Sequence, residues 1–165
     1  MDIYELLRQG QHRALARFDA LLDASDDGPE RRRELLAEMQ SELFQHERAA
    51  NSLYGALLRS GAEPGAILAA IESQSMVRQF LAEMERSAVD SNCWLGSVAL
   101  LRRLVEEHFD EQEGAVLLAR EHLAAGDVRM LAEMHACKRA AEESAGLRLD
   151  AAERGAGALR AADVG

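Results

Sequence analysis

Apolar side chains recur every three or four residues along almost the whole chain, and this spacing limits the fold more than any other feature. Long stretches of it cover about residues 2–23, 30–60, 65–89 and 93–125. Such spacing is typical of helices that bury one face. Short polar stretches such as ASDDGPE (24–30) and SGAEPG (60–65) separate the segments. Because short turns make successive helices antiparallel, the sequence predicts an all-α, up-down-up-down four-helix bundle.

The C-terminal part is expected to add one more helix. It begins after Gly126, which should stop the preceding helix, and runs over about residues 127–147. The remaining residues, 148–165, include few large apolar side chains, so we expect a flexible tail there. Residues 1–147 then form one domain, large enough to bury a hydrophobic core.

Charge and composition narrow the partners and the setting. The chain has 29 acidic and 19 basic residues, a net charge of −10, which disfavours nucleic acid and membrane surfaces as partners. No apolar run approaches the roughly 20 residues of a membrane span. The opening MDIYELLRQG is acidic and amphipathic, unlike a signal peptide. Cys93 and Cys137 lack the spacing of a metal site, and a reducing cytoplasmic setting is expected.

Polar residues interrupt the apolar face of each of the four long segments. They are Gln11 (with His12 at its flank), His46, Gln74, and the pair His108 and Gln112. In an antiparallel bundle these positions can meet at one level. A buried polar group without a partner costs a few kcal/mol, so we expect these side chains to bond to one another, to a ligand or to water.

Longer stretches around these residues follow a known pattern. The stretches are DIYELLRQGQH (2–12), HERAANSLYGAL (46–57), WLGSVALLRRLVEEHFDEQEGAVL (94–117) and MLAEMHACKRA (130–140). Over about residues 2–140 the chain resembles the hemerythrin-like HHE cation-binding domain family. Members of that family hold two carboxylate-bridged irons with a His on helices one and three and a His-x-x-x-Glu on helices two and four. The resemblance implies oxygen, iron or nitrosative-stress chemistry in a bacterial cytoplasm.

The chain departs from the family at most of the metal-ligand positions. His46 and His108 are retained, but Ala50 and Gln112 stand where the resemblance places the two bridging carboxylates, and Gln74 replaces the third-helix His. Amide oxygens are weak, neutral substitutes for carboxylates. Two cations a few ångströms apart would then repel each other with little to offset the repulsion. We therefore predict that an ordinary di-iron centre is absent.

Two residues of the first helix are alternatives for its metal-ligand position. An ungapped alignment puts Gln11 at the ligand position, whereas a shift of one residue would put His12 there. With His12, the side chains of His46 and His108 would complete a three-histidine site for a single Zn or Fe. Nearby acids are not expected to replace the lost carboxylates, since Glu111 and Glu113 lie about 100° from the apolar face.

Two functions remain after these considerations. The first is a non-catalytic binding or sensing module for a small molecule or a protein partner, as a monomer or homodimer, in which His–Gln hydrogen bonds close the old metal cavity. The alternative is a protein that still binds a single metal ion. An enzyme is not expected. No histidine has the Glu three residues earlier that ferritin-like oxidases use, and no Gly-x-Ser-x-Gly hydrolase motif is present.

Overall fold

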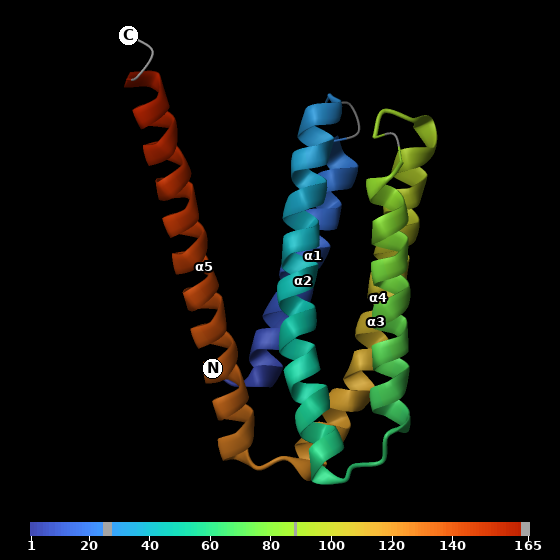
Figure 1. Cartoon of the computed structure of the whole chain (residues 1–165). Helices are drawn as coiled ribbons and strands as arrows, with labels where there is room; N and C mark the ends of the chain where they lie inside the picture. Colours follow the sequence, from blue (N-terminus) through green and yellow to red (C-terminus); the bar gives the residue numbers. More distant parts are fainter. Residues whose placement is uncertain (25–27, 88, 163–165) are drawn as a thin grey trace.

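In the computed structural model, residues 1–24, 28–87 and 89–162 are described, except for the side chains of Asn92, Glu143 and 145–162. All regular structure within these ranges is helical, which confirms the predicted all-α class. The helices are α1 (Ile3–Asp23), α2 (Pro29–Ser60), α3 (Gly65–Glu85), α4 (Asn92–His122) and α5 (Ala125–Ala162). Figure 1 shows α1 to α4 side by side, each running opposite to the helix before it.

Local sequence explains where the first two helices begin and end. The Asp2 side chain caps α1 by accepting a 2.9 Å hydrogen bond from the backbone N–H of Glu5. Pro29 opens α2, where its missing N–H costs nothing. Gly61 ends α2 in the left-handed region, at φ 76°, which a residue with a side chain rarely adopts. The chain can therefore turn sharply into α3.

The boundary between α4 and α5 differs from the sequence prediction. Leu123, in extended backbone at φ −108° and ψ 135°, ends α4, and α5 already begins at Ala125. Gly126 therefore lies in the first turn of α5 and does not stop α4. The expected tail from residue 148 is also different, because α5 continues to Ala162; residues 163–165 lie outside the described part. Residues 148–162 are rich in Ala and Arg, which favour helix even without an apolar face to bury.

The first turns of α5 pack against the other helices. Val128 and Leu131 are buried in the same apolar cluster as residues of α1 and α2. Farther along, an ion pair joins Glu142 of α5 to Arg48 of α2. Beyond this point α5 leans away from α1–α4 (Figure 1). Across the described ranges, no helix is long and apolar enough to cross a membrane.

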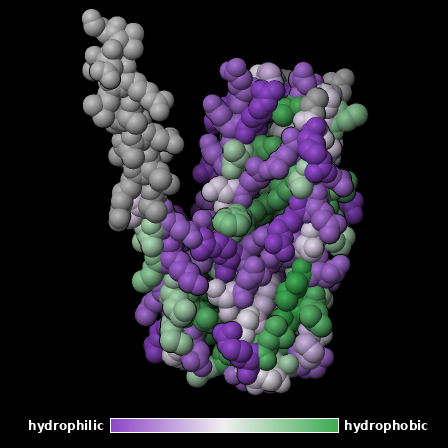
Figure 2. Space-filling model, viewed as in Figure 1, coloured by the Kyte–Doolittle hydropathy of each residue, from purple (hydrophilic) through white to green (hydrophobic). Residues whose placement is uncertain are grey.

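Charged side chains cover most of the surface and connect neighbouring helices. Arg17 of α1 pairs with Glu38 of α2 at 2.6 Å, and Arg102 of α4 pairs with Asp19 of α1 at 2.8 Å. Figure 2 shows many hydrophilic side chains on this face, interrupted by hydrophobic patches, of which a broad one lies at the lower right. Exposed pairs of this kind each stabilise a fold by about 1 kcal/mol at most, so burial of the apolar faces is the main source of stability.

The apolar core consists of two separate clusters. One cluster includes Ala14, Phe18, Leu43, Val77, Trp94 and Phe109. The other includes Ile3, Leu7, Ala49, Leu53, Ala70 and Ala115. Each of the four helices passes from one cluster to the other within a few residues. Between the two clusters, each helix contributes a short stretch of residues to a layer that crosses α1–α4.

Candidate functional site

The layer between the two apolar clusters is polar and buried. His46, Gln74, His108 and Gln112 are each at most 3% exposed, as their positions in the apolar stripes predict. Each lies where its helix passes from one cluster to the other. We refer to these four residues, with Gln11, Tyr54 and Ser73, as the polar layer.

Gln112 is the centre of a hydrogen-bond chain through this layer. Its side-chain oxygen accepts from the Gln11 amide at 3.0 Å, and its own amide donates to the Tyr54 hydroxyl at 3.0 Å. Burial raises the pKa of Tyr54 to about 12, although the hydrogen bond from Gln112 opposes this shift. The expected His–Gln hydrogen bonds do not reach full hydrogen-bond geometry, although the Gln112 side chain lies near enough to His46 to act on its pKa. The amides pair with each other and with a phenol, which leaves the histidines to other partners.

His108 has one satisfied ring nitrogen and one open one. The Ser73 hydroxyl lies 2.8 Å from His108 Nδ1 and donates to the carbonyl of Ala70 at 3.0 Å. With its single proton in the bond to Ala70, the hydroxyl accepts from His108, so that Nδ1 carries the ring proton. His108 Nε2 is then a bare acceptor, and it is buried without a partner. This is the form in which a histidine binds a metal or accepts a proton.

His46 is the least satisfied residue of the layer. Both ring nitrogens are buried without a hydrogen bond. The ring lies edge-on to Phe109, with centroids 5.0 Å apart, and 6.4 Å from the ring of His108. Gly10 of α1 makes this packing possible, since a Cβ at that position would lie 2.8 Å from His46 Nδ1. The close approach of α1 thus encloses the imidazole.

Burial keeps both imidazoles neutral. Loss of water, followed by repulsion from His108, lowers the pKa of His46 to about 3. The Gln112 side chain and the Leu7 carbonyl oppose this shift, although neither meets hydrogen-bond geometry with the ring. Burial alone lowers the pKa of His108 to about 4. The layer therefore offers uncharged nitrogen lone pairs at neutral pH.

The first helix contributes Gln11 to the layer and turns His12 away from it. Gln11 is half-buried and bonded to Gln112, whereas His12 is exposed. The proposed three-histidine site of His12, His46 and His108 is therefore not assembled. No group of three or more His, Cys, Asp or Glu side chains that could hold a metal occurs among the described residues.

The other predicted positions provide little for a metal. Ala50 is fully buried and has no polar atom. Gln74 donates to Asn51 at 3.3 Å, and its oxygen is buried without a partner. Glu111 and Glu113 are exposed, as expected. The donor set is thus two neutral histidines and amide oxygens, which does not fit a pair of irons that needs bridging carboxylates.

Sequence reasoning missed Ser73, Tyr54 and Glu47 as parts of this region. Ser73 stands one position before Gln74, and Glu47 stands one position after His46, so spacing alone did not mark either residue. Glu47, on α2 next to His46, is only 7% exposed. Burial raises the pKa of its carboxyl to about 7, while Arg78, with its Nε 3.8 Å from Glu47 Oε2, opposes the shift. A buried acid beside a histidine is a signal that could have drawn attention.

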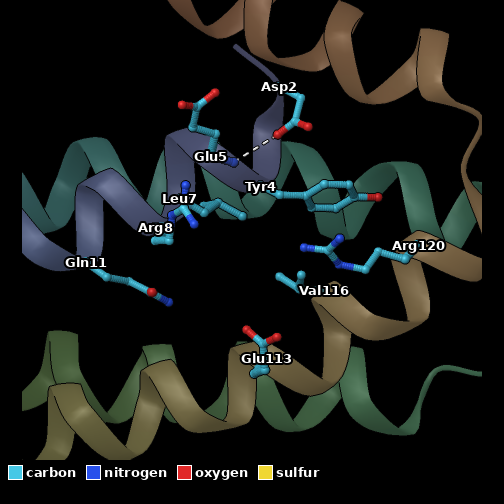
Figure 3. Close-up of a pocket in the computed structure, with 9 residues that line it drawn as sticks. All are labelled: Asp2, Tyr4, Glu5, Leu7, Arg8, Gln11, Glu113, Val116 and Arg120. Carbon is cyan, nitrogen blue, oxygen red and sulfur yellow. Dashed lines mark hydrogen bonds between the residues drawn. The ribbon is translucent and has the colours of Figure 1, made fainter.

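A cleft of about 600 Å³ lies at the surface between α1 and α4 (Figure 3). Apolar side chains of Leu7 and Val116 line it, together with charged side chains of both signs and Gln11. Gln11 therefore belongs to both the cleft and the polar layer. This side chain connects a solvent-facing space to the buried Gln112–Tyr54 chain.

In comparisons with known proteins, the chain matches no protein-family model, no curated protein and no solved structure.

Proposed function

We propose that this chain is a hemerythrin-like, up-down-up-down four-helix bundle with an additional C-terminal helix, in which a polar layer replaces the di-iron centre. It acts as a non-catalytic binding or sensing module. The observation that carries the proposal is the donor set of the layer. Ala50 and Gln112 stand at the two positions where the hemerythrin-like pattern has the bridging carboxylates. Ala50 is fully buried, and Gln112 is already hydrogen-bonded to Gln11 and Tyr54.

The arrangement of the layer supports binding better than catalysis. Its histidines are neutral and enclosed, so neither is placed to exchange protons with a substrate at neutral pH. The Gln112 chain reaches the surface cleft through Gln11. A ligand in the cleft can therefore change the hydrogen bonding of the core without any chemical step.

Metal loading tests this proposal. Tag-free protein is incubated anaerobically with Fe(II) or Zn(II) and desalted, and then metal content and visible absorption are measured. We expect no retained pair of irons and no oxo-bridge absorption band. A pair of irons per chain with that band would refute the proposal and restore an iron or oxygen role. Circular dichroism of the same sample verifies that the helices are intact.

A second candidate function is the binding of a single metal ion by His46 and His108. The buried, unpartnered ring nitrogens favour it, in particular His108 Nε2, which Ser73 orients. One retained zinc or iron that disappears in His46→Ala would establish this function. His12→Ala is the matched control, because His12 is exposed and should leave the metal content unchanged.

A further inference from the structure

The cleft between α1 and α4 combines the size of a ligand site with an unusual charge pattern. Its volume of about 600 Å³ lies within the range of small-molecule pockets. Asp2, Glu5 and Glu113 supply negative charge, and Arg8 and Arg120 supply positive charge. None of these five side chains makes an ion pair within the described residues. The Glu5 carboxylate points away from α4, whereas Glu113 and Arg120 point into the space between α1 and α4 (Figure 3). The opposite charges of Glu113 and Arg120 thus face one space without neutralising each other.

Arginines elsewhere on the same two helices behave differently. Arg13 pairs with Glu42 at 2.9 Å, and Arg102 pairs with Asp19 at 2.8 Å. Arg120 instead places its guanidinium carbon over the Tyr4 ring, 4.7 Å from the ring centroid. A cation–π contact needs no N–H hydrogen bond, so the N–H donors of Arg120 remain for a carboxylate. The ring thus holds Arg120 in place without consuming its hydrogen-bond donors.

Three different polar groups converge on the cleft. Figure 3 shows the Glu113 carboxylate and the Arg120 guanidinium, both from α4, and the Gln11 amide from α1, all directed toward the space between the two helices. A simple anion would approach Arg120 but would be repelled by Glu113. A simple cation would be attracted by Glu113 but repelled by Arg120. A small molecule with both charges satisfies both groups.

From this geometry we propose that the cleft binds a small zwitterion of the α-amino-acid type. Its carboxylate binds Arg120, its ammonium group binds Glu113, and its side chain rests on Leu7 and Val116. The inference rests on the proposed binding or sensing function and gives it a ligand class.

Gln11 couples the occupied cleft to the buried layer. A primary amide has two N–H donors and one acceptor oxygen, and only one donor is used, in the bond to Gln112. The other donor and the oxygen remain for the ligand. When a ligand reorients the Gln11 amide, the Gln112–Tyr54 chain must adjust, because Gln112 is fully buried and has no water to replace a lost bond.

The test is an NMR titration of the full ¹⁵N-labelled chain. Each common L-α-amino acid is added singly to about 10 mM, since weak binders have Kd values near 1 mM. We expect at least one to shift the side-chain signals of Gln11, Arg120 and Gln112. The N-acetyl and carboxamide derivatives of that amino acid should bind at least about tenfold more weakly, because each lacks one charge. If no amino acid shifts the Gln11 and Arg120 signals, or if the N-acetyl derivative binds equally well, the zwitterion site is refuted.

Matched variants locate the site. Arg120→Met and Glu113→Gln should each weaken binding at least about tenfold. Arg103→Met and Glu121→Gln are the controls, since both are exposed on α4 and neither lines the cleft. Equal losses in the controls would mean that the overall charge of α4, and not the cleft, attracts the ligand.

A third variant tests the coupling. In Gln11→Leu the ligand should no longer shift the Gln112 signal, and a shift that persists would refute the role of Gln11. Failure of the proposed function is distinguishable, because metal loading measures His46 and His108, which do not line the cleft. A pair of retained irons would overturn the proposed function while leaving the titration result intact.

Discussion

The two buried histidines should make the protein sensitive to mild acid. Their pKa values fall from 6.5 to about 3 for His46 and about 4 for His108. In the unfolded chain both rings take up protons below pH 6.5, whereas in the folded chain they stay neutral until pH 4 or lower. The free energy of unfolding therefore decreases as the pH drops below about 6.5. Between pH 7.5 and pH 5 each histidine should remove about 2 kcal/mol.

Glu47 acts in the opposite direction over the same range. Its pKa rises from 4.5 to about 7 in the folded chain, so the folded carboxyl is protonated where the unfolded one is charged. Its contribution to stability is present below pH 4.5 and is lost as the pH rises through 7. Acidification from pH 7.5 to pH 5 should therefore restore about 2 kcal/mol. Taken together, the three groups leave a net loss of about 2 kcal/mol in the wild-type chain.

Variants separate the two effects. Glu47→Gln removes the compensating carboxyl, so its loss of stability between pH 7.5 and pH 5 should grow to about 4 kcal/mol. His46→Gln removes one of the acid-sensitive rings and should bring the loss close to zero. His12→Gln is the control, because water surrounds this ring in the folded and the unfolded chain alike. Other titrating groups affect all variants equally and cancel in the comparison.

The assay is urea unfolding followed by circular dichroism at the two pH values, in metal-free buffer. If Glu47→Gln loses no more stability than wild type, the Glu47 carboxyl is not protonated in the folded chain. If Glu47→Gln loses less than about 1 kcal/mol, the histidines are not held neutral, and burial does not control the layer.

Three further predictions concern single contacts, and urea unfolding checks each. Gly10→Ala should destabilise the chain by about 1–3 kcal/mol, because the new Cβ would press on the His46 ring. Gly96→Ala is the control: a Cβ there has nothing within 4 Å and should stabilise the chain by about 0.5–1 kcal/mol. Equal effects of the two substitutions would contradict the close packing of Gly10 on His46. Gln112→Leu should cost about 1–3 kcal/mol, because it leaves the buried Tyr54 hydroxyl and the half-buried Gln11 amide without their partner; a neutral effect would show that water replaces the amide. Ser73→Ala should cost about 1 kcal/mol and change the ¹⁵N shifts of the His108 ring, whereas an unchanged spectrum would mean that the hydroxyl does not fix the tautomer.

The helices and the level of the polar layer could be predicted from the sequence because both depend on spacing alone. His46 and Gln112 stand in phase with apolar neighbours at three- and four-residue intervals, and a helix must place them on the same face. On the first helix the same spacing places Gln11 on the apolar face with His12 at its flank; the alignment left both open as the ligand position, and the burial of the two side chains decides for Gln11. The end of α5 was not predictable in this way, because its later part has helix-forming residues but no apolar face to mark its length.

The hydrogen bonds of the layer could not be predicted, because they depend on distances between helices. Phase shows that Gln112 points inward, but not that Tyr54 lies 3.0 Å from it. Ser73 lies one position away from the stripe of α3 and reaches His108 only because α3 and α4 pack closely. For a short side chain at the edge of a helix face, the position of the neighbouring helix determines the hydrogen-bond partner.

The layer costs stability, and this cost favours a binding role over a purely structural one. Both nitrogens of His46, Nε2 of His108 and the oxygen of Gln74 are buried without a partner among the described residues. Each such atom costs about 1–3 kcal/mol, whereas leucines at the same positions would join the two apolar clusters. A scaffold selected only for stability gains nothing from this arrangement. A module that receives a signal gains from it, because a polar network whose hydrogen bonds are only partly satisfied has more than one arrangement of similar energy. A small change at Gln11 can then select between them.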